Sequence, residues 1–166
     1  TGEKINVQGF NFDVMFTSEL KRAQNTGEII LEKLNEPNLA TIKSVNLNER
    51  DYGDLTGMNK DEARAEFGEE QVHIWRRSYD VPPPGGESLK DTYDRVIPYF
   101  ESDIMPELNE SKNVLIAAHG NSLRSLVKFI EDLNETDILK LEIATGEPII
   151  YKFIDGRFTS LSLIHI

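Results

Sequence analysis

The sequence predicts an α/β fold with three layers (α/β/α), in which helices cover both faces of a mostly parallel sheet. Short apolar runs that indicate buried strands alternate along the chain with stretches whose apolar residues recur at helical spacing. Two of these runs, 12–18 and 114–118, lead directly into a helical stretch, as parallel strands joined by crossover helices do. The 166 residues fit one domain with a substantial core, and we expect a single domain over 1–166.

The composition limits the partners of this domain. A formal net charge of −11 argues against a surface that binds nucleic acid or an anionic membrane. No apolar run approaches the roughly 20 residues that span a bilayer, so we expect no membrane partner. The chain has no cysteine, which excludes a thiolate metal site and fits a cytoplasmic location. An acidic total still allows a local cationic pocket. Six cations fall in polar, motif-like stretches of the sequence: Arg22, Arg50, Lys60, Arg76, Arg77 and Arg124.

The first part of the chain predicts the order helix, strand, helix, strand. Residues 1–9 have the pattern of a helix end with Gly9 as the stop signal, and 12–18 follow as a strand. A second strand is expected around 42–45. The helix between the strands carries an apolar stripe: Leu20, Ala23, Ile30, Leu31 and Leu34. Arg22 falls in the first turn of this helix, where it could form a surface ion pair or direct its planar fork at a phosphate.

Two polar stretches in the middle of the chain hold candidate ligand groups. Residues 46–60 are a predicted loop, which is followed by a short helix over 60–67 and could also be a solvated charge run. The loop presents a carboxylate, an arginine, a phenol and a lysine: Glu49, Arg50, Tyr52 and Lys60. In 75–88, the adjacent Arg76 and Arg77 lie beside aromatic residues and indicate an anion clamp, or else a rigid proline-rich connector with solvated arginines.

A capped helix is predicted after Ser88. Ser88 is a favourable N-cap residue, and Asp91 lies at the capping-box position. We expect Pro98 and Pro106 to kink or break this helix, because proline lacks the amide hydrogen and its ring clashes with the preceding turn. The apolar face has helical spacing: Leu89, Thr92, Val96 and Tyr99.

The strand at 114–118 ends in His-Gly-Asn-Ser, and apolar residues then recur at helical spacing. His119 would therefore sit where a strand ends and a helix begins, which is the usual ligand crevice of open α/β sheets and a favourable place for an anion. The alternative is a turn histidine that only caps the helix. Of the other histidines, we expect His73 to be a solvated helix residue and His165 to be structural.

The C-terminal region predicts a short helix over 135–141 and then a β-hairpin. Asp155-Gly156 is a strong two-residue turn signal, and β-forming residues lie on both sides of it. We expect the two strands at 148–154 and 157–166.

Six motifs resemble those of the cofactor-dependent phosphoglycerate mutases of the histidine phosphatase superfamily. In chain order they are FTSELKRA (16–23), NERDYGDLTG (48–57), RRSYDVPPP (76–84), GESLKDT (86–92), AAHGNSLR (117–124) and ATG (144–146). They follow the family's order over nearly the whole chain, and the direct passage from Pro84 to Gly85 is similar to the compact form of the family. The match of all six together is far more specific than any one of them.

The resemblance implies a reaction and a role for each matching residue. Such enzymes interconvert 3-phosphoglycerate and 2-phosphoglycerate in glycolysis and gluconeogenesis, through a phosphohistidine that is primed by 2,3-bisphosphoglycerate, without a metal. Arg22 would hold the transferring phosphoryl group, His119 would stabilise its charge beside the nucleophile, and Glu49 would be the general acid/base. The resemblance assigns the small phosphoglycerate substrate to seven residues: Arg50, Tyr52, Lys60, Arg76, Arg77, Gly120 and Asn121. It leaves a monomer or a homodimer open.

The Arg-His-Gly motif that carries the family's nucleophile does not occur in this sequence. We therefore expect an N-terminally incomplete domain that lacks the strand before this motif and does not use the phosphohistidine route as written. The alternatives are a phosphatase of the same superfamily and a binding module that keeps the clamp without the nucleophile. Arg76-Arg77 and the loop from Glu49 to Lys60 favour the mutase, because a mutase must hold the far end of its substrate while the substrate reorients.

Overall fold

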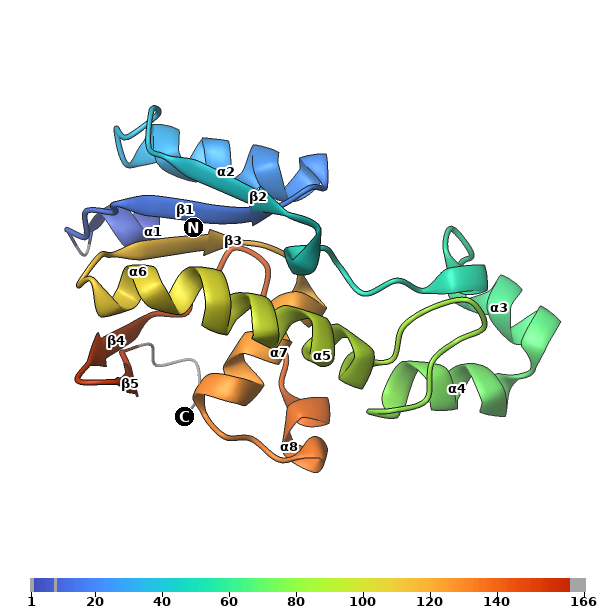
Figure 1. Cartoon of the computed structure of the whole chain (residues 1–166). Helices are drawn as coiled ribbons and strands as arrows, with labels where there is room; N and C mark the ends of the chain where they lie inside the picture. Colours follow the sequence, from blue (N-terminus) through green and yellow to red (C-terminus); the bar gives the residue numbers. More distant parts are fainter. Residues whose placement is uncertain (1, 8, 162–166) are drawn as a thin grey trace.

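A parallel sheet of three strands lies at the centre of the protein, in a computed structural model that describes residues 2–7 and 9–161 (Figure 1). The strands are β1 (Val14–Ser18), β2 (Thr41–Ser44) and β3 (Val114–Ala117), in the spatial order β2-β1-β3. Phe16 of β1 lies opposite Ile42 on one side and Ile116 on the other. The predicted parallel sheet and its three predicted strands are confirmed.

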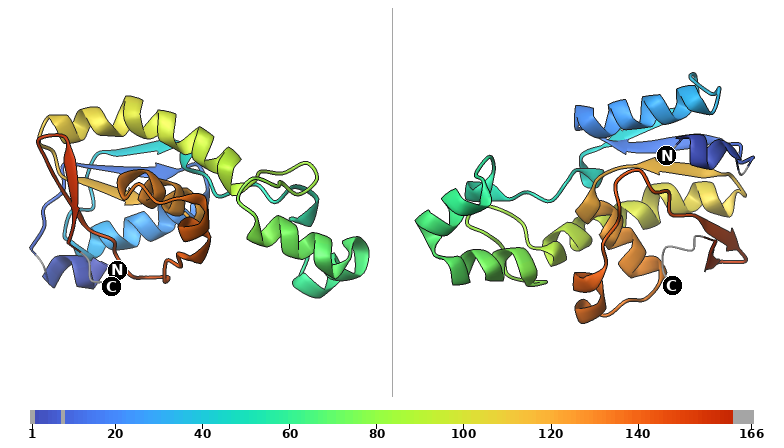
Figure 2. Two further views of the ribbon diagram at one scale, coloured as in Figure 1. Left: turned by 90° about the horizontal axis from the view of Figure 1, so that it is seen from below. Right: turned by 180° about the vertical axis from the view of Figure 1, so that it is seen from behind.

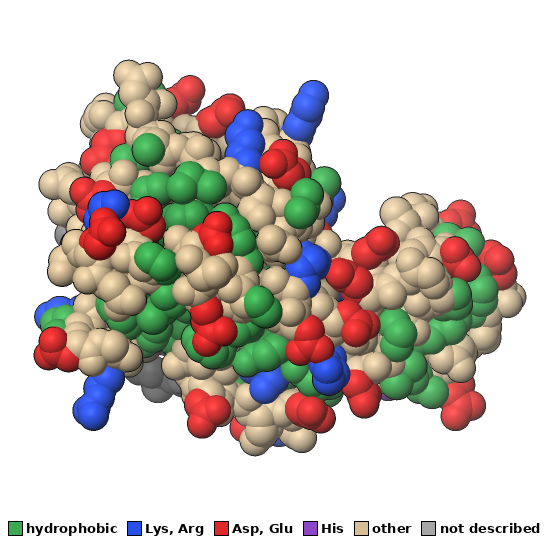
Figure 3. All heavy atoms as spheres, viewed as in Figure 1, with side chains coloured by type: hydrophobic (Ala, Val, Ile, Leu, Met, Phe, Trp, Pro, Cys, Tyr) green, Lys and Arg blue, Asp and Glu red, His purple; other side chains and the backbone are tan. Residues whose placement is uncertain are grey.

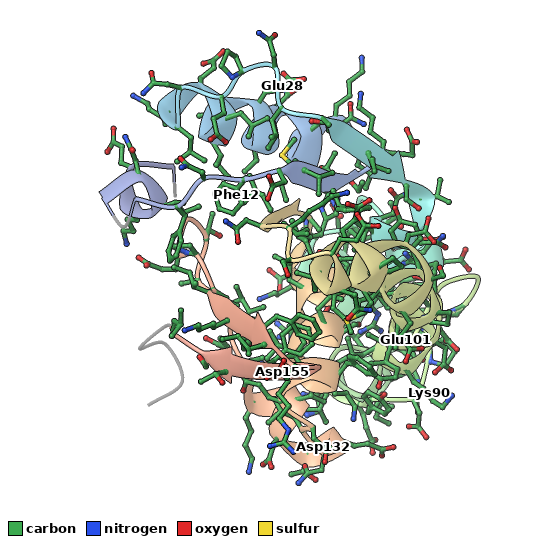
Figure 4. All side chains as sticks on the ribbon, turned by 60° about the vertical axis from the view of Figure 1, so that its left-hand side comes forward. Phe12, Glu28, Lys90, Glu101, Asp132 and Asp155 are labelled. Atoms are coloured by element: carbon green, nitrogen blue, oxygen red, sulfur yellow. The ribbon has the colours of Figure 1, made fainter. Side chains whose placement is uncertain are left out.

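Helices cover both faces of this sheet, as the sequence predicts. The helices α1 (Gly2–Val7) and α2 (Lys21–Lys33) pack on one face. The other face is covered by α5 (Leu89–Tyr99) and α7 (Gly120–Ile130). In Figure 4, Glu28 on α2 and Glu101 beyond the end of α5 lie on opposite sides of the sheet.

Two apolar clusters fill the spaces between these layers. The cluster under α1 and α2 consists of Ile5, Met15, Ile30, Leu31, Leu115 and Ala117. The larger cluster, under α5 and α7, includes Val14, Phe16, Leu47, Val96, Phe100 and Leu126. Because β1 sends side chains to both clusters and all five of its residues are buried, it is the centre of the core.

The helix that begins after Ser88 is not broken at its prolines, so the expected break is wrong, although the helical path is distorted by a π turn before Pro106. Pro98 lies inside α5, and the helical path continues through a π-helical turn, η3 (Phe100–Ile104), into α6 (Met105–Asn109). In the π turn, the N–H of Met105 bonds to the carbonyl of Phe100, five residues earlier. This wider turn directly precedes Pro106, whose ring would otherwise clash with the carbonyl of the fourth residue before it. The predicted N-cap and capping box at Ser88 and Asp91 are confirmed.

Two helices form a lobe beyond the end of the sheet, which we call the α3–α4 lobe (Figures 1 and 2). It consists of α3 (Lys60–Phe67), as predicted, and α4 (Glu69–Arg77), with Leu55, Ala63, Val72 and Trp75 as its small apolar core. Acidic side chains are spread over both the lobe and the main body on the face in Figure 3, in line with the net charge of −11.

Two loops connect the lobe to the main body, and they are bonded to each other. The N–H of Asp54 donates to the carbonyl of Pro84 at 2.9 Å, and the N–H of Glu87 donates to the carbonyl of Asp51 at 2.7 Å. The first loop contains the short helices η1 (Val45–Leu47) and η2 (Gly53–Leu55). The backbones approach so closely that a Cβ atom on Gly53 would lie 2.2 Å from the carbonyl oxygen of Pro84.

The C-terminal part of the described chain forms α8 (Glu135–Lys140) and the predicted hairpin. The hairpin pairs β4 (Tyr151–Ile154) with β5 (Arg157–Ser160) in antiparallel fashion. Asp155 and Gly156 both have positive φ angles, 51° and 76°, as a type I′ turn requires. The rest of the predicted last strand, 162–166 with His165, lies outside the described residues. No helix in the described part of the chain is long and apolar enough to cross a membrane.

The close approach at Gly53 leads to a stability prediction with a matched control. Gly53 and Gly57 both have positive φ, but a Cβ on Gly57 would meet nothing within 4 Å. We expect Gly57→Ala to lower the free energy of unfolding by about 1 kcal/mol through backbone strain alone. Gly53→Ala adds a clash with backbone and should cost about 2 to 5 kcal/mol. Urea unfolding of both variants measures the difference, and equal losses would contradict the close approach.

Candidate active site

His119 lies in the turn between β3 and α7, and both of its ring nitrogens are engaged. The side chain is only 6% exposed. Arg22 donates from Nε to Nδ1 of His119 at 3.2 Å, and Nε2 lies 2.8 Å from Oγ of Ser18 at the end of β1. A guanidinium can only donate, so Nδ1 is the acceptor and the ring proton sits on Nε2, which donates to Ser18. In this arrangement, neither nitrogen has a free lone pair for nucleophilic attack.

The surroundings of His119 favour its neutral form. Burial lowers the pKa of the ring below its ordinary value of 6.5, and the nearby cations Arg22 and Arg95 lower it further. The carboxylate of Glu49 opposes these effects. The backbone N–H of His119 donates to Oγ of Ser122 at 3.1 Å, which fixes the turn at the start of α7. His119 is therefore a rigid neutral hydrogen-bonding group at the ends of two neighbouring strands.

The carboxylate of Glu49 occupies the N-terminal end of α7. Its Oε1 accepts the backbone N–H of Asn121 at 3.1 Å and that of Arg50 at 2.8 Å. The sequence predicts that free N–H groups here favour an anion, and within the described structure that anion is a carboxylate of the chain itself. A Cβ on Gly120 would lie 3.8 Å from Oε2 of Glu49, so the carboxylate also lies close to the backbone of Gly120.

Asn121 links Glu49 to the loop residues Tyr52 and Arg50. Its side-chain Nδ2 donates to the hydroxyl of Tyr52 at 3.1 Å, and the guanidinium of Arg50 lies 5.1 Å from the centre of the Tyr52 ring. Arg50 itself is 6% exposed and donates to two backbone carbonyls, those of Glu87 at 2.6 Å and Trp75 at 2.9 Å. Burial lowers the pKa of Arg50 from its ordinary value. Arg50 is thus built into the wall of the site, with two of its nitrogens already bonded to protein.

The cations Lys60, Arg76 and Arg77 lie together on the α3–α4 lobe. They line a cavity of about 170 Å³ with Arg64, Glu69 and His73. Lys60 lies at the start of α3, whereas Arg76 and Arg77 lie in the last turn of α4. His73 is an exposed helix residue, as predicted, but it also lines this cavity. The described structure therefore holds the predicted site residues in two adjoining groups, one around His119 and one on the lobe.

The sequence reasoning missed the residues that hold the first group in place. Glu87 and Arg95 form a two-point ion pair with both N–O distances at 2.9 Å. Arg95 also donates to the carbonyls of Val45, Asn46 and Asn48, which precede Glu49 in the loop. Glu87 accepts the backbone N–H of Asp51 at 3.1 Å on the other side of Glu49. No local pattern reveals these contacts, because they join Arg95 on α5, and Glu87 just before it, to a loop 36 to 50 residues earlier.

Ser18 was also missed, although its place in the sequence gave a usable signal. It is the last residue of β1, beside the end of β3, and strand ends at this edge face the ligand crevice. Its Oγ accepts the backbone N–H of Leu20 at 3.1 Å as well as contacting His119. The position of Ser18 at the end of a buried strand could therefore have indicated it as a partner for His119, which follows the neighbouring strand β3.

The geometry defines the class of protein: an α/β protein in which a neutral histidine and a carboxylate lie at the ends of parallel strands, beside a group of arginines. The chain matches the family described as "Histidine phosphatase superfamily (branch 1)" over residues 4–165, and it belongs to this family. The resemblance on which the sequence analysis relied is thereby confirmed.

The relatives agree with this family. The chain is 60% identical over 151 residues to the 2,3-bisphosphoglycerate-dependent phosphoglycerate mutase of Bradyrhizobium sp. (strain ORS 278), covering 91% of this chain and 73% of the relative. It is 57% identical over 164 residues to the phosphoglycerate mutase of Schizosaccharomyces pombe, covering 98% of this chain and 78% of the relative.

Solved structures show the same fold at much lower identity. A vanadate (VO3) complex of mycobacterial glucosyl-3-phosphoglycerate phosphatase matches with a TM-score of 0.77 at 19% identity, over 97% of this chain and 79% of that one. The alpha-ribazole phosphatase from Shigella flexneri matches with a TM-score of 0.77 at 20% identity, over 96% and 77%. The three-layer fold predicted from the sequence is confirmed by these matches.

The environment of His119 leads to a pH prediction. We expect the ring to titrate below 6.5, and we expect Arg22→Met to raise its midpoint by removing a neighbouring cation. In the unchanged protein, the unfolded chain takes up this proton at a higher pH than the folded chain does. His119 should therefore reduce folding stability as pH falls below 6.5. NMR titration of the ring protons measures the midpoint, and Arg157→Met on the distant hairpin is the charge-matched control. A wild-type midpoint above 6.5 would contradict this picture.

The ion pair between Glu87 and Arg95 gives a second prediction. The side chains of Arg95 and Glu87 are 21% and 25% exposed, so Glu87→Gln leaves a mostly buried cation without its partner charge. We expect the free energy of unfolding to fall by about 1 to 3 kcal/mol. As a control, Asp94→Asn breaks the exposed pair with Lys90 on the same helix and should have a much smaller effect. Urea unfolding compares the two, and similar losses would show that the Glu87 pair is no more than a surface contact.

Proposed function

We propose that this chain is a 2,3-bisphosphoglycerate-dependent phosphoglycerate mutase, which interconverts 3-phosphoglycerate and 2-phosphoglycerate in the cytoplasm as part of glycolysis and gluconeogenesis. One observation carries the proposal: a neutral histidine, an arginine and a carboxylate lie at the strand ends beside a separate group of cations. This combination suits a substrate with an anionic group at each end. Relatives at 57–60% identity with the same name support it.

Arg22 and His119 are suited to the transferring phosphoryl group. Arg22 uses Nε for His119, so the two terminal nitrogens of its guanidinium remain for phosphoryl oxygens. Phosphoryl transfer needs fixed positive charge and hydrogen-bond donors around the equatorial oxygens and little other chemistry from the protein. The Nε2–H of His119, which donates to Oγ of Ser18, would share its hydrogen bond with a phosphoryl oxygen as charge develops there.

Glu49 is suited to move the hydroxyl proton of the substrate. The two N–H groups that bond to Oε1 hold the carboxylate in one orientation, and Oε2 has no hydrogen bond within the described structure. A general base must lie within hydrogen-bond reach of the proton it removes, and Oε2 is the atom that can do so. In the second half of the reaction, the same atom would give the proton to the substrate oxygen from which the other phosphoryl group leaves.

Lys60, Arg76 and Arg77 are suited to the far end of the substrate, with Tyr52, Asn121 and Gly120 between the two groups. Arg50 would contribute mainly by its charge and by supporting Tyr52, since its Nε and one terminal nitrogen bond to carbonyls. Cations that hold the far end allow the substrate to reorient without leaving, which distinguishes a mutase from a phosphatase. The same cations fit the second phosphate of 2,3-bisphosphoglycerate as the primer.

The phosphohistidine of this route is not assigned to a described residue. His119 has both ring nitrogens engaged, and His73 lies on α4 in the lobe cavity. We expect the printed chain to bind phosphoglycerate and yet acquire no acid-labile phosphate from labelled 2,3-bisphosphoglycerate. Intact-mass measurement must show that the assayed protein has the 18.9 kDa of this chain. Mutase turnover by a protein of that mass would contradict the expectation.

A chimaera tests the function itself. An N-terminal segment of the Schizosaccharomyces pombe relative, chosen to carry the family's Arg-His-Gly motif, would be joined ahead of residue 1. We expect the chimaera to form 2-phosphoglycerate from 3-phosphoglycerate, detected through coupling to enolase. Release of free phosphate without 2-phosphoglycerate would favour a phosphatase, and binding without either product would favour a binding module.

A binding variant tests the far-end clamp in the printed chain. We expect Arg76→Gln to weaken the binding of 3-phosphoglycerate by about 10- to 100-fold, because a hydrogen bond to a charged group contributes about 1.5 to 3 kcal/mol. Arg157→Gln removes the same charge from the hairpin and should leave the affinity nearly unchanged. Isothermal titration calorimetry measures both, and equal affinities for the two variants would exclude Arg76 from the clamp.

A further inference from the structure

A second small cavity shares Arg76 and Arg77 with the lobe cavity but is not lined by Lys60. It has a volume of about 100 Å³ and is bounded by the end of α4, the start of α5, α7 and the segment after α8. Its wall includes Arg50, Arg76, Arg77, Arg124, Leu139 and Glu142. Arg124, Leu139 and Glu142 have no part in the proposed mutase site.

The charge in this cavity is strongly unbalanced. Four guanidinium groups face one carboxylate, that of Glu142, and Glu142 is exposed. Arg50 and Arg77 act on Arg124 as like charges, and burial together with these charges lowers the pKa of Arg124 from its ordinary value. An arginine remains a cation even so, because its ordinary pKa lies far above neutral pH. The protein therefore holds four positive charges together around a small space at a cost in repulsion.

Two donors at this cavity have no acceptor among the described residues. The Nε atoms of Arg76 and Arg124 are both buried and unpaired. The remaining nitrogens of Arg124 are held, since Nη1 donates to Oδ1 of Asn121 at 3.3 Å and Nη2 donates to the carbonyl of Ile138 at 2.5 Å. Buried donors are nearly always paired in native proteins, so two unpaired Nε atoms at one cationic cavity indicate an acceptor other than the described residues.

We infer that this cavity is a binding site for an oxyanion of carboxylate or phosphate size, with Arg124 and Arg76 as its principal ligands. Guanidinium groups match the oxygens of such an anion through parallel hydrogen bonds. A volume of about 100 Å³ admits one such group. The site requires only the fold and would bind its anion whether or not the chain turns over phosphoglycerates. The anion is either the far carboxylate of a bound substrate or a separate small oxyanion.

Inorganic phosphate is the probe, with binding followed by isothermal titration calorimetry and ³¹P NMR on the printed chain. We expect Arg124→Met to weaken phosphate binding at the cavity by at least about tenfold, because a charge-assisted hydrogen bond is lost. Arg124→Lys keeps the charge without the Nε donor, so its affinity for phosphate should lie between those of the unchanged protein and Arg124→Met. Thermal unfolding shows whether each variant is folded, and Arg157→Met is the charge-matched control on the hairpin.

A gain-of-binding variant keeps the test independent of folding. Glu142→Gln removes the one carboxylate in the wall and should tighten phosphate binding about two- to fivefold, a change that a misfolded protein cannot produce. Phosphate binding that is unaffected by both Arg124→Met and Glu142→Gln would overturn the inference.

Two further measurements separate this site from the proposed mutase site and identify its anion. Arg22→Met should abolish binding at the phosphoryl site of the proposed function and leave the cavity occupied. If Arg22→Met alone abolishes all phosphate binding, the cavity site is wrong and the proposed function survives. If only Arg124→Met weakens phosphate binding, the cavity site survives and the proposed phosphoryl site is wrong. Saturating 3-phosphoglycerate displaces the cavity phosphate if its carboxylate occupies the site, and leaves it bound if the anion is separate.

Discussion

The ion pair between Glu87 and Arg95 fixes the loop on which the candidate active site depends. Arg95 binds three carbonyls that precede Glu49, and Glu87 binds the amide of Asp51 that follows it. Glu49 is thus held from both sides by a partly buried pair anchored on α5, which itself packs on the sheet. With the loop on this course, the Glu49 carboxylate reaches the first turn of α7, so the ion pair would support the proposed chemistry without touching a reacting atom.

An acidic protein with a strongly cationic site needs a way to hold its arginines without neutralising them. The structure does so with neutral acceptors: Arg50 bonds to two backbone carbonyls, and Arg124 bonds to a carbonyl and an amide oxygen. A carbonyl orients a guanidinium but leaves its full charge for a ligand. On the face in Figure 3, acidic side chains are spread over both the lobe and the main body, in line with the net charge of −11.

The sequence predicts the features that depend on neighbours along the chain. The three strands, the capping box at Ser88 and Asp91, and the turn at Asp155-Gly156 follow from local propensity, and each is confirmed. The motif residues around His119 could also be grouped, since strand ends of a parallel sheet meet at one edge. The π turn before Pro106, the bonding of Arg50 to carbonyls and the Glu87–Arg95 pair could not be predicted. Each depends on contacts between residues far apart in the chain, and local patterns in a single sequence do not reveal such contacts.

The two loops that lead to the α3–α4 lobe have a consequence for motion. They are bonded to each other at Asp54–Pro84 and Asp51–Glu87, and Gly53 brings their backbones into contact. Two loops that are bonded to each other in this way cannot bend independently. The α3–α4 lobe would therefore move as one rigid body about the start of α5. Lys60, Arg76 and Arg77 would then advance or withdraw as a set, with their mutual spacing preserved at every degree of opening.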